Sequence, residues 1–130
     1  MRKTSYRYML PCHITIGANK RKRLSLNLNQ YRNTHYQVLA KMKREFSPIG
    51  DYELFVANKI KIKYILHHKT RRKTDLMNWV SICDKFFLDW LVSNGCIPDD
   101  AIRYCDDIHA ISRYDETISD MYIEAIVTIL

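Results

Sequence analysis

The sequence predicts a small α+β domain in which two main helices pack on a mixed or antiparallel β-sheet. Two stretches, residues 30–46 and 76–94, space their apolar residues as helices do, and residues 55–66 alternate as a strand does. Two further β-rich segments, residues 103–112 and 121–129, complete the sheet. With 130 residues, 47% of them hydrophobic, and only three glycines and three prolines, the chain suits a single domain covering residues 1–130.

The first expected element is a strand over residues 6–16, bent at Pro11 or lying at a sheet edge, because proline donates no ladder hydrogen bond. A basic loop is expected over residues 17–23. The helix over residues 30–46 carries its cations near its C-terminal end, where they complement the helix dipole. Ser47 and Pro48 are expected to end this helix.

The clearest strand pattern lies in residues 55–66, where Lys59, Lys61 and Lys63 alternate with apolar residues. Alternation of this kind indicates one buried and one cationic face. A merely solvated lysine face is the alternative. Because the strand leads directly into a basic tract at residues 67–73, we favour a surface that faces DNA.

The helix expected over residues 76–94 has one broad apolar arc that indicates core packing. The arc contains Leu76, Trp79, Val80, Cys83, Phe86, Phe87, Trp90 and Leu91. The opposite face collects Asn78, Ser81, Lys85 and Asp89, while Asp84 falls near the edge of the arc. Gly95 is expected to end the helix in the left-handed conformation.

Charge is divided unevenly along the chain, whose formal net charge is +7. Residues 1–73 hold 18 of the 21 Lys and Arg and 3 of the 14 Asp and Glu, so this part has a charge of +15 and residues 74–130 have −8. Such asymmetry favours a nucleic-acid or membrane partner. No apolar run approaches the roughly 20 residues that span a bilayer, and the first residues lack an apolar signal core. We therefore expect a cytoplasmic protein that binds no membrane.

The four cysteines, Cys12, Cys83, Cys96 and Cys105, show no CxxC spacing. Reduced cysteines that serve in packing are the favoured interpretation, and disulfides remain the alternative.

Residues 69–100 combine the two kinds of group that phosphodiester cleavage requires. A basic tract precedes Asp75 and Asn78, the helix carries Lys85 and Asp89, and a carboxylate pair closes the segment. Cations hold a polyanion, and carboxylates hold a divalent metal at the scissile phosphate. Taken singly, Asp75 also suits a helix N-cap, and Pro98-Asp-Asp a turn.

The motifs Asp75-Leu-Met-Asn78, Asp84-Lys85-Phe-Phe-Leu-Asp89 and Gly95-Cys-Ile-Pro-Asp99-Asp100 resemble those of the RusA family of Holliday junction resolvases, which are common in phages and prophages. Residues 25–33 also resemble the N-terminal segment of that family. The resemblance implies a RusA-like fold and a homodimeric endonuclease of DNA recombination and repair. It implies Mg²⁺ as cofactor with Mn²⁺ as a substitute, four-way or branched DNA as substrate, and a bacterial host cell.

Carried over residue by residue, the resemblance assigns catalysis to Asp75, Asn78, Lys85 and Asp100. It assigns metal binding to Asp75, Asp100 and Asp99. Two departures stand out. Met77 replaces a second aspartate, and the helix is about one turn longer before Lys85. Asp84 or Asp89 would compensate for the missing carboxylate by position on the helix, and Asp89 has the better direction.

Phosphate contacts are expected from a set of cations in the N-terminal half of the chain, which hold DNA without reading its sequence. The set contains Lys20, Arg21, Lys22, Arg23, Arg32, Lys69, Arg71, Arg72 and Lys73. Two other functions stay open. One is a catalytically inactive module of the same fold that binds junctions or single strands, as Met77 suggests; the other is a small RNA-binding protein. No small-molecule substrate is expected.

Overall fold

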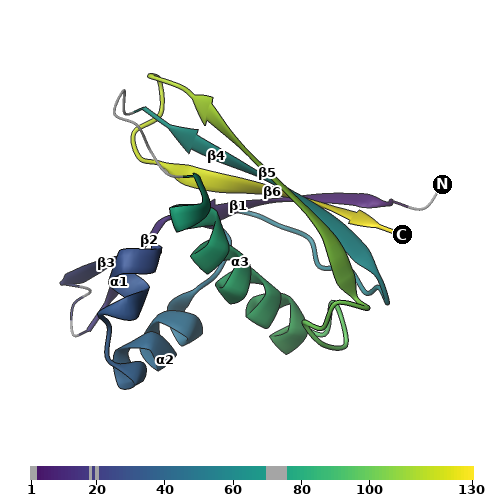
Figure 1. Cartoon of the computed structure of the whole chain (residues 1–130), viewed down its shortest axis with the longest axis horizontal. Coiled ribbons are helices and arrows are strands. Elements are labelled where there is room, and N and C mark those ends of the chain that lie inside the picture. Colours follow the sequence, from purple (N-terminus) through teal and green to yellow (C-terminus); the bar gives the residue numbers. More distant parts are fainter. Residues whose placement is uncertain (1–2, 18, 20, 70–75) are drawn as a thin grey trace.

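A four-stranded mixed sheet in the order β1-β6-β4-β5 organises the molecule, and a two-stranded sheet, β2-β3, stands beside it (Figure 1). The computed structural model describes residues 3–17, 19, 21–69 and 76–130. In chain order the elements are β1 (Ser5–Pro11), β2 (His13–Ile16), β3 (Lys22–Ser25), α1 (Leu28–Arg32), α2 (Tyr36–Glu45), β4 (Ile60–His68), α3 (Leu76–Ser93), β5 (Cys105–Tyr114) and β6 (Tyr122–Ile129). The chain is therefore a small single-domain α+β protein, as predicted.

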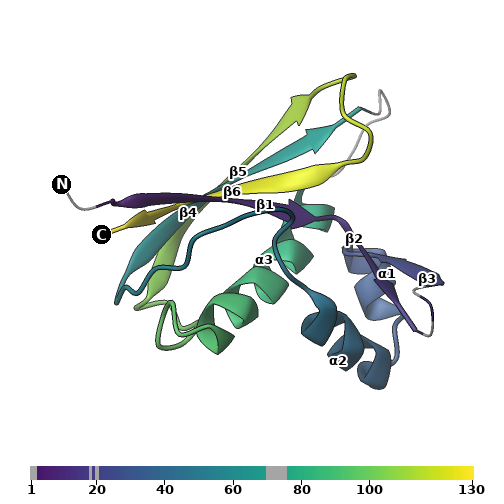
Figure 2. The same ribbon diagram turned by 180° about the vertical axis from the view of Figure 1, so that it is seen from behind.

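Strand β6 lies at the centre of the sheet and pairs antiparallel with both β1 and β4. Strands β4 and β5 pair in parallel, and α3 is the crossover between them. Figures 1 and 2 show α1, α2 and α3 on the same side of this sheet. The opposite face of the sheet carries the exposed Lys61 and Lys63 of β4.

The core forms where the alternating face of β4 meets the apolar arc of α3. Ile60, Ile62, Tyr64 and Leu66 of β4 are at most 2% exposed, and so is Phe87 of α3. The Phe87 ring lies 5.4 Å from that of Tyr8 in β1, and 6.0 Å from that of Trp90 one turn later. The predicted face of α3 is thus confirmed. All four cysteines are buried and free, as the packing interpretation requires.

Gly95 ends α3 as predicted. Its φ is +73°, a conformation that a residue with a Cβ rarely adopts. This bend lets Cys96 N–H donate to Leu91 O at 2.9 Å and Gly95 N–H to Val92 O at 3.0 Å, which satisfies the last carbonyls of the helix.

The single helix predicted over residues 30–46 was wrong, because the chain forms two helices there. Asn33 ends α1, and its N–H donates to Asn29 O at 3.3 Å. His35 then caps α2, its Nδ1 accepting from Gln37 N–H at 3.2 Å. Local side-chain and backbone hydrogen bonds therefore replace the helical ladder at this break.

The first predicted strand is divided into two. β1 ends at Pro11 on the edge of the main sheet, and β2 pairs with β3 in the small sheet. The expected basic loop is shorter than predicted, because Lys22 and Arg23 belong to β3. The predicted strand over residues 55–66 begins later, at Ile60, and runs on to His68.

Replacing Phe87 by Ala is expected to lower the free energy of unfolding by about 3–5 kcal/mol, because it leaves a cavity at the contact between helix and sheet. Val56→Ala serves as the control, since Val56 is 84% exposed, and should change stability by less than about 0.5 kcal/mol. Urea unfolding followed by circular dichroism measures both. Equal effects of the two substitutions would contradict this account of the core.

Candidate active site

The structure describes part of the predicted site. Asn78, Lys85 and Asp89 lie on α3, and Asp99 and Asp100 lie in the segment that follows it. Asp75, Lys20, Arg71, Arg72 and Lys73 lie outside the described residues.

Three of the predicted residues share one face of α3, as expected, and this face holds the two shorter helices. Asn78 Oδ1 accepts a hydrogen bond from Leu28 N–H at 3.0 Å, at the start of α1. Lys85 Nζ lies 5.9 Å from the centroid of the Tyr31 ring in α1.

Farther along the same face, Asp89 Oδ2 lies 3.2 Å from Lys43 Nζ in α2. Each of the three predicted side chains therefore contacts a neighbouring helix, and each has a structural role in positioning α1 or α2.

A hollow of about 730 Å³ lies where α2 approaches the C-terminal end of α3. Three predicted metal ligands, Asp89, Asp99 and Asp100, line it together with the cations Lys43 and Arg44. Both signs of charge thus border one open hollow, with the cations on α2 and the carboxylates on α3 and the segment after it. This arrangement suits a phosphate group near a divalent cation.

The predicted residues do not all meet at this hollow. Asn78 and Asp89 are eleven residues apart on α3, which places them about 16 Å apart along the helix axis. Asn78 and Lys85 are not among the residues that line the hollow. The described residues of the predicted site are therefore spread out, and only the carboxylates near the C-terminal end of α3 border the same hollow.

Asp99 and Asp100 supply the kind of oxygen ligand that a magnesium site would require. Magnesium prefers oxygen ligands and needs only one or two carboxylates, because waters and a substrate phosphate complete its shell. In the part of the chain that the structure describes, no three His, Cys, Asp or Glu side chains converge on a common point. Asp89 is paired with Lys43, and Asp99 Oδ1 accepts from the N–H of Asp100 at 2.8 Å, as in the turn alternative.

Asp84 is a further acidic residue of interest, which the sequence placed only at the edge of the apolar arc. It lies between α3 and the sheet, where the Tyr64 hydroxyl donates a 2.5 Å hydrogen bond to its Oδ1. Burial raises the pKa of the Asp84 carboxyl, and the carboxylate of Asp100 adds to this, while Tyr64 and Lys85 oppose it. A carboxylate on the margin of an apolar helix face is the sequence signal for such a residue.

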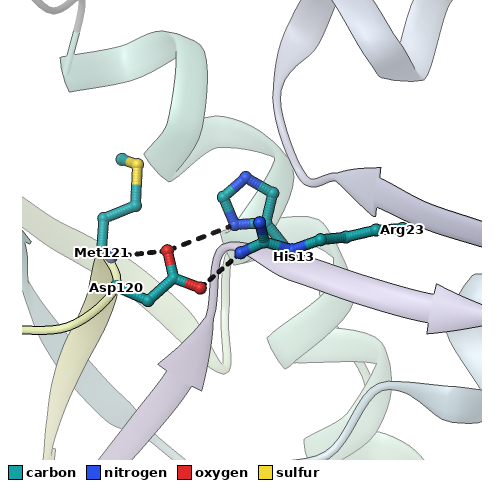
Figure 3. Close-up of polar contacts among 4 residues, drawn as sticks. All are labelled: His13, Arg23, Asp120 and Met121. Atoms are coloured by element: carbon teal, nitrogen blue, oxygen red, sulfur yellow. Dashed lines mark hydrogen bonds and ion pairs between the residues drawn. The ribbon is translucent and has the colours of Figure 1, made fainter.

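Arg21, Lys22 and Arg23 of the β2–β3 hairpin are exposed, yet Arg23 already has an anionic partner. Figure 3 shows Arg23 in an ion pair with Asp120, whose Oδ1 also lies 3.9 Å from His13 Nδ1. Burial lowers the pKa of His13, and the nearby Arg23 adds to this, against the attraction of Asp120. The ion pair with Asp120 therefore offsets part of the positive charge that Arg23 offers to a phosphate.

The other described cations of the predicted phosphate-binding set lie on the surface. Arg21, Lys22, Arg32 and Lys69 are all exposed. Lys59, which the sequence pattern placed on the cationic face of the strand, precedes β4 and pairs with Asp106 at 3.2 Å.

Comparison with protein-family models and with curated proteins gives no match to this chain. The RusA resemblance therefore stays a prediction that rests on the motifs alone. Among the described residues, no helix is long and apolar enough to cross a membrane.

Asn78→Ala is expected to destabilise the fold by about 1–2 kcal/mol, because it leaves Leu28 N–H without its acceptor. Asn78→Asp retains an oxygen at this position and is the matched control, with stability close to that of the wild type. Chemical unfolding of both variants measures the difference. A fully stable Asn78→Ala variant would refute the structural role of this side chain.

The raised pKa of Asp84 makes the stability of the fold depend on pH. The folded chain binds the Asp84 proton more tightly than the unfolded chain does. The free energy of unfolding therefore falls as the pH rises from the unfolded pKa of this carboxyl to its folded pKa. Asp84→Asn keeps an acceptor for Tyr64 but carries no charge. We expect the variant to gain stability relative to the wild type as the pH rises from about 3 to 8. Urea unfolding at several pH values measures this, and a difference independent of pH would contradict it.

Proposed function

We propose that this chain is a magnesium-dependent endodeoxyribonuclease that cuts four-way or branched DNA and acts as a homodimer. The observation that supports this most is the hollow at the C-terminal end of α3, where Lys43 and Arg44 lie across from Asp99 and Asp100. The charge division of the chain and the resemblance to RusA motifs support the same function. In this proposal the protein is phage- or prophage-encoded and acts in the bacterial cytoplasm.

The residues of the hollow have complementary tasks in the proposed reaction. Lys43 and Arg44 attract a DNA phosphate, and Arg44, with its planar fork of donors, suits bidentate contact with phosphate oxygens. Asp99 and Asp100 would hold the magnesium ion, which when bound supplies positive charge against the phosphate and makes water more nucleophilic. Lys85 lies one turn before Asp89 on α3, outside the lining of the hollow, and would add positive charge to the field around it.

Specific observations favour a second candidate, a binding module of the same fold that does not cleave. Met77, 53% exposed on α3, stands where the family has a second aspartate. The carboxylate of Asp89, which was expected to compensate, is already paired with Lys43. Under this alternative the cations hold branched DNA, and the carboxylates shape the surface.

The decisive experiment incubates the protein with a labelled synthetic four-way junction and with a matched linear duplex, each with Mg²⁺, Mn²⁺ or EDTA. We expect paired symmetric nicks in the junction alone, only with metal. The double variant Asp99→Asn/Asp100→Asn should cut at least about a hundredfold more slowly, since it removes the carboxylates that would hold the metal. Asp75→Asn tests the carboxylate that the resemblance places first.

Glu116→Gln, an exposed substitution in the β5–β6 connection, is the matched control and should cut like the wild type. Junction binding without cleavage in either metal would support the binding module. Absence of any preference for the junction over the duplex would refute both candidates.

A further inference from the structure

The outer edge of β5 is open in this structure. β5 is the last strand in the sheet order, and most of its residues are exposed. Within the described residues, no strand pairs with this edge. Proteins commonly protect such edges with lysine, proline or a covering segment, yet β5 contains neither residue.

The other edge of the sheet is protected. Ile49, in the segment between α2 and β4, donates its N–H to Met9 O of β1 at 2.7 Å. The Tyr8 hydroxyl donates to Glu53 O of the same segment at 2.5 Å. The β1 edge of the sheet is thus covered and the β5 edge is not, so the outward backbone N–H and C=O groups of β5 are available to pair with a further strand.

The sequence of β5 is complementary to itself in the antiparallel direction. We propose that β5 pairs antiparallel with β5 of a second copy, about a two-fold axis at Ala110. The regular part of the strand begins at Asp107, because the register with β4 shifts just before it. In the proposed register Asp107 lies opposite Arg113 of the second copy, and the symmetry forms this pair twice.

Asp107 and Arg113 have the geometry that this pairing needs. They align with Lys61 and His67 of β4, an even number of residues apart in each strand, so both side chains belong to one face of the sheet. Both are exposed. Opposite charges at directly facing positions stabilise a strand pair, whereas like charges destabilise it.

The other face of β5 supplies apolar contact. Ile108 is 41% exposed and Tyr114 is 45% exposed, and both lie on this face. The proposed register places Ile108 opposite Ser112 of the second copy, between its Ala110 and its Tyr114. Pairing therefore covers an apolar side chain that the single chain leaves in water.

The resulting dimer has a continuous sheet with both helical layers on the same side, because the two-fold axis is perpendicular to the sheet. Since both open edges are used, the assembly closes and does not extend into a fibre. The dimer rests on the proposed function, in which the hollows of both chains would face one DNA junction. Dimer formation is measured without DNA or metal, so its result is independent of whether the protein cleaves DNA.

Sedimentation velocity over a range of concentrations tests the pairing. The wild type should sediment with twice the 15.5 kDa mass of one chain. Asp107→Arg and Arg113→Asp each place like charges opposite one another twice, and each should weaken association about tenfold or more. The double variant Asp107→Arg/Arg113→Asp restores opposite charges and should dimerise like the wild type.

A wild type that stays monomeric would overturn the proposal. The proposal would also be overturned if neither single substitution weakened the dimer, or if the double variant failed to dimerise like the wild type. Circular dichroism of each variant separates loss of pairing from loss of fold.

A disulfide trap tests the register directly. Directly opposite residues in an antiparallel pair have Cα atoms about 4.5–5.5 Å apart, within the range for a disulfide. Ala110→Cys should therefore form a covalent dimer under mild oxidation, whereas the native cysteines are buried. Ser119→Cys, exposed in the β5–β6 connection, is the control. Equal cross-linking of the two variants, or none by Ala110→Cys, would overturn the register.

Discussion

The packing of α3 on the sheet is the constraint on which the rest of the structure depends. Phe86, Phe87 and Leu91 are at most 1% exposed, and the Phe87 ring packs against Tyr8 of β1 and Tyr64 of β4. Because α3 is also the crossover between two parallel strands, its buried face fixes where β4 and β5 lie relative to one another. Its polar face then determines where α1 and α2 attach, and the C-terminal end of α2 forms one side of the hollow.

Polar residues at the margins of α3 serve the fold and the candidate site together. Asn78 and Asp89 tie the shorter helices to α3, so their presence in a motif does not by itself indicate chemistry. Asp99 and Asp100 are exposed in the segment after the helix. A carboxylate in a loop can bind a ligand without releasing a helix, whereas a carboxylate that holds a helix in place cannot.

Much of the fold could be predicted from local patterns, because these depend on neighbours in the chain. The apolar arc of α3, its end at Gly95 and the alternation in β4 are of this kind. The break between α1 and α2 was missed because it depends on capping by His35 and on the docking of α1 at Asn78, far away in sequence. The hollow was missed for the same reason, since no spacing pattern relates the cations of α2 to the carboxylates after α3.

The place of β1 in the sheet has a consequence for how the chain folds. Its neighbour is β6, and the ladder joins Ser5 to Thr128, so almost the whole chain must be present before this pairing forms. By contrast, β4, α3 and β5 follow one another directly and can associate through short loops. Closing a long loop costs more conformational entropy than closing a short one. During synthesis, β1 therefore leaves the ribosome long before its partner β6, and it can take its place in the sheet only after β6 has been made.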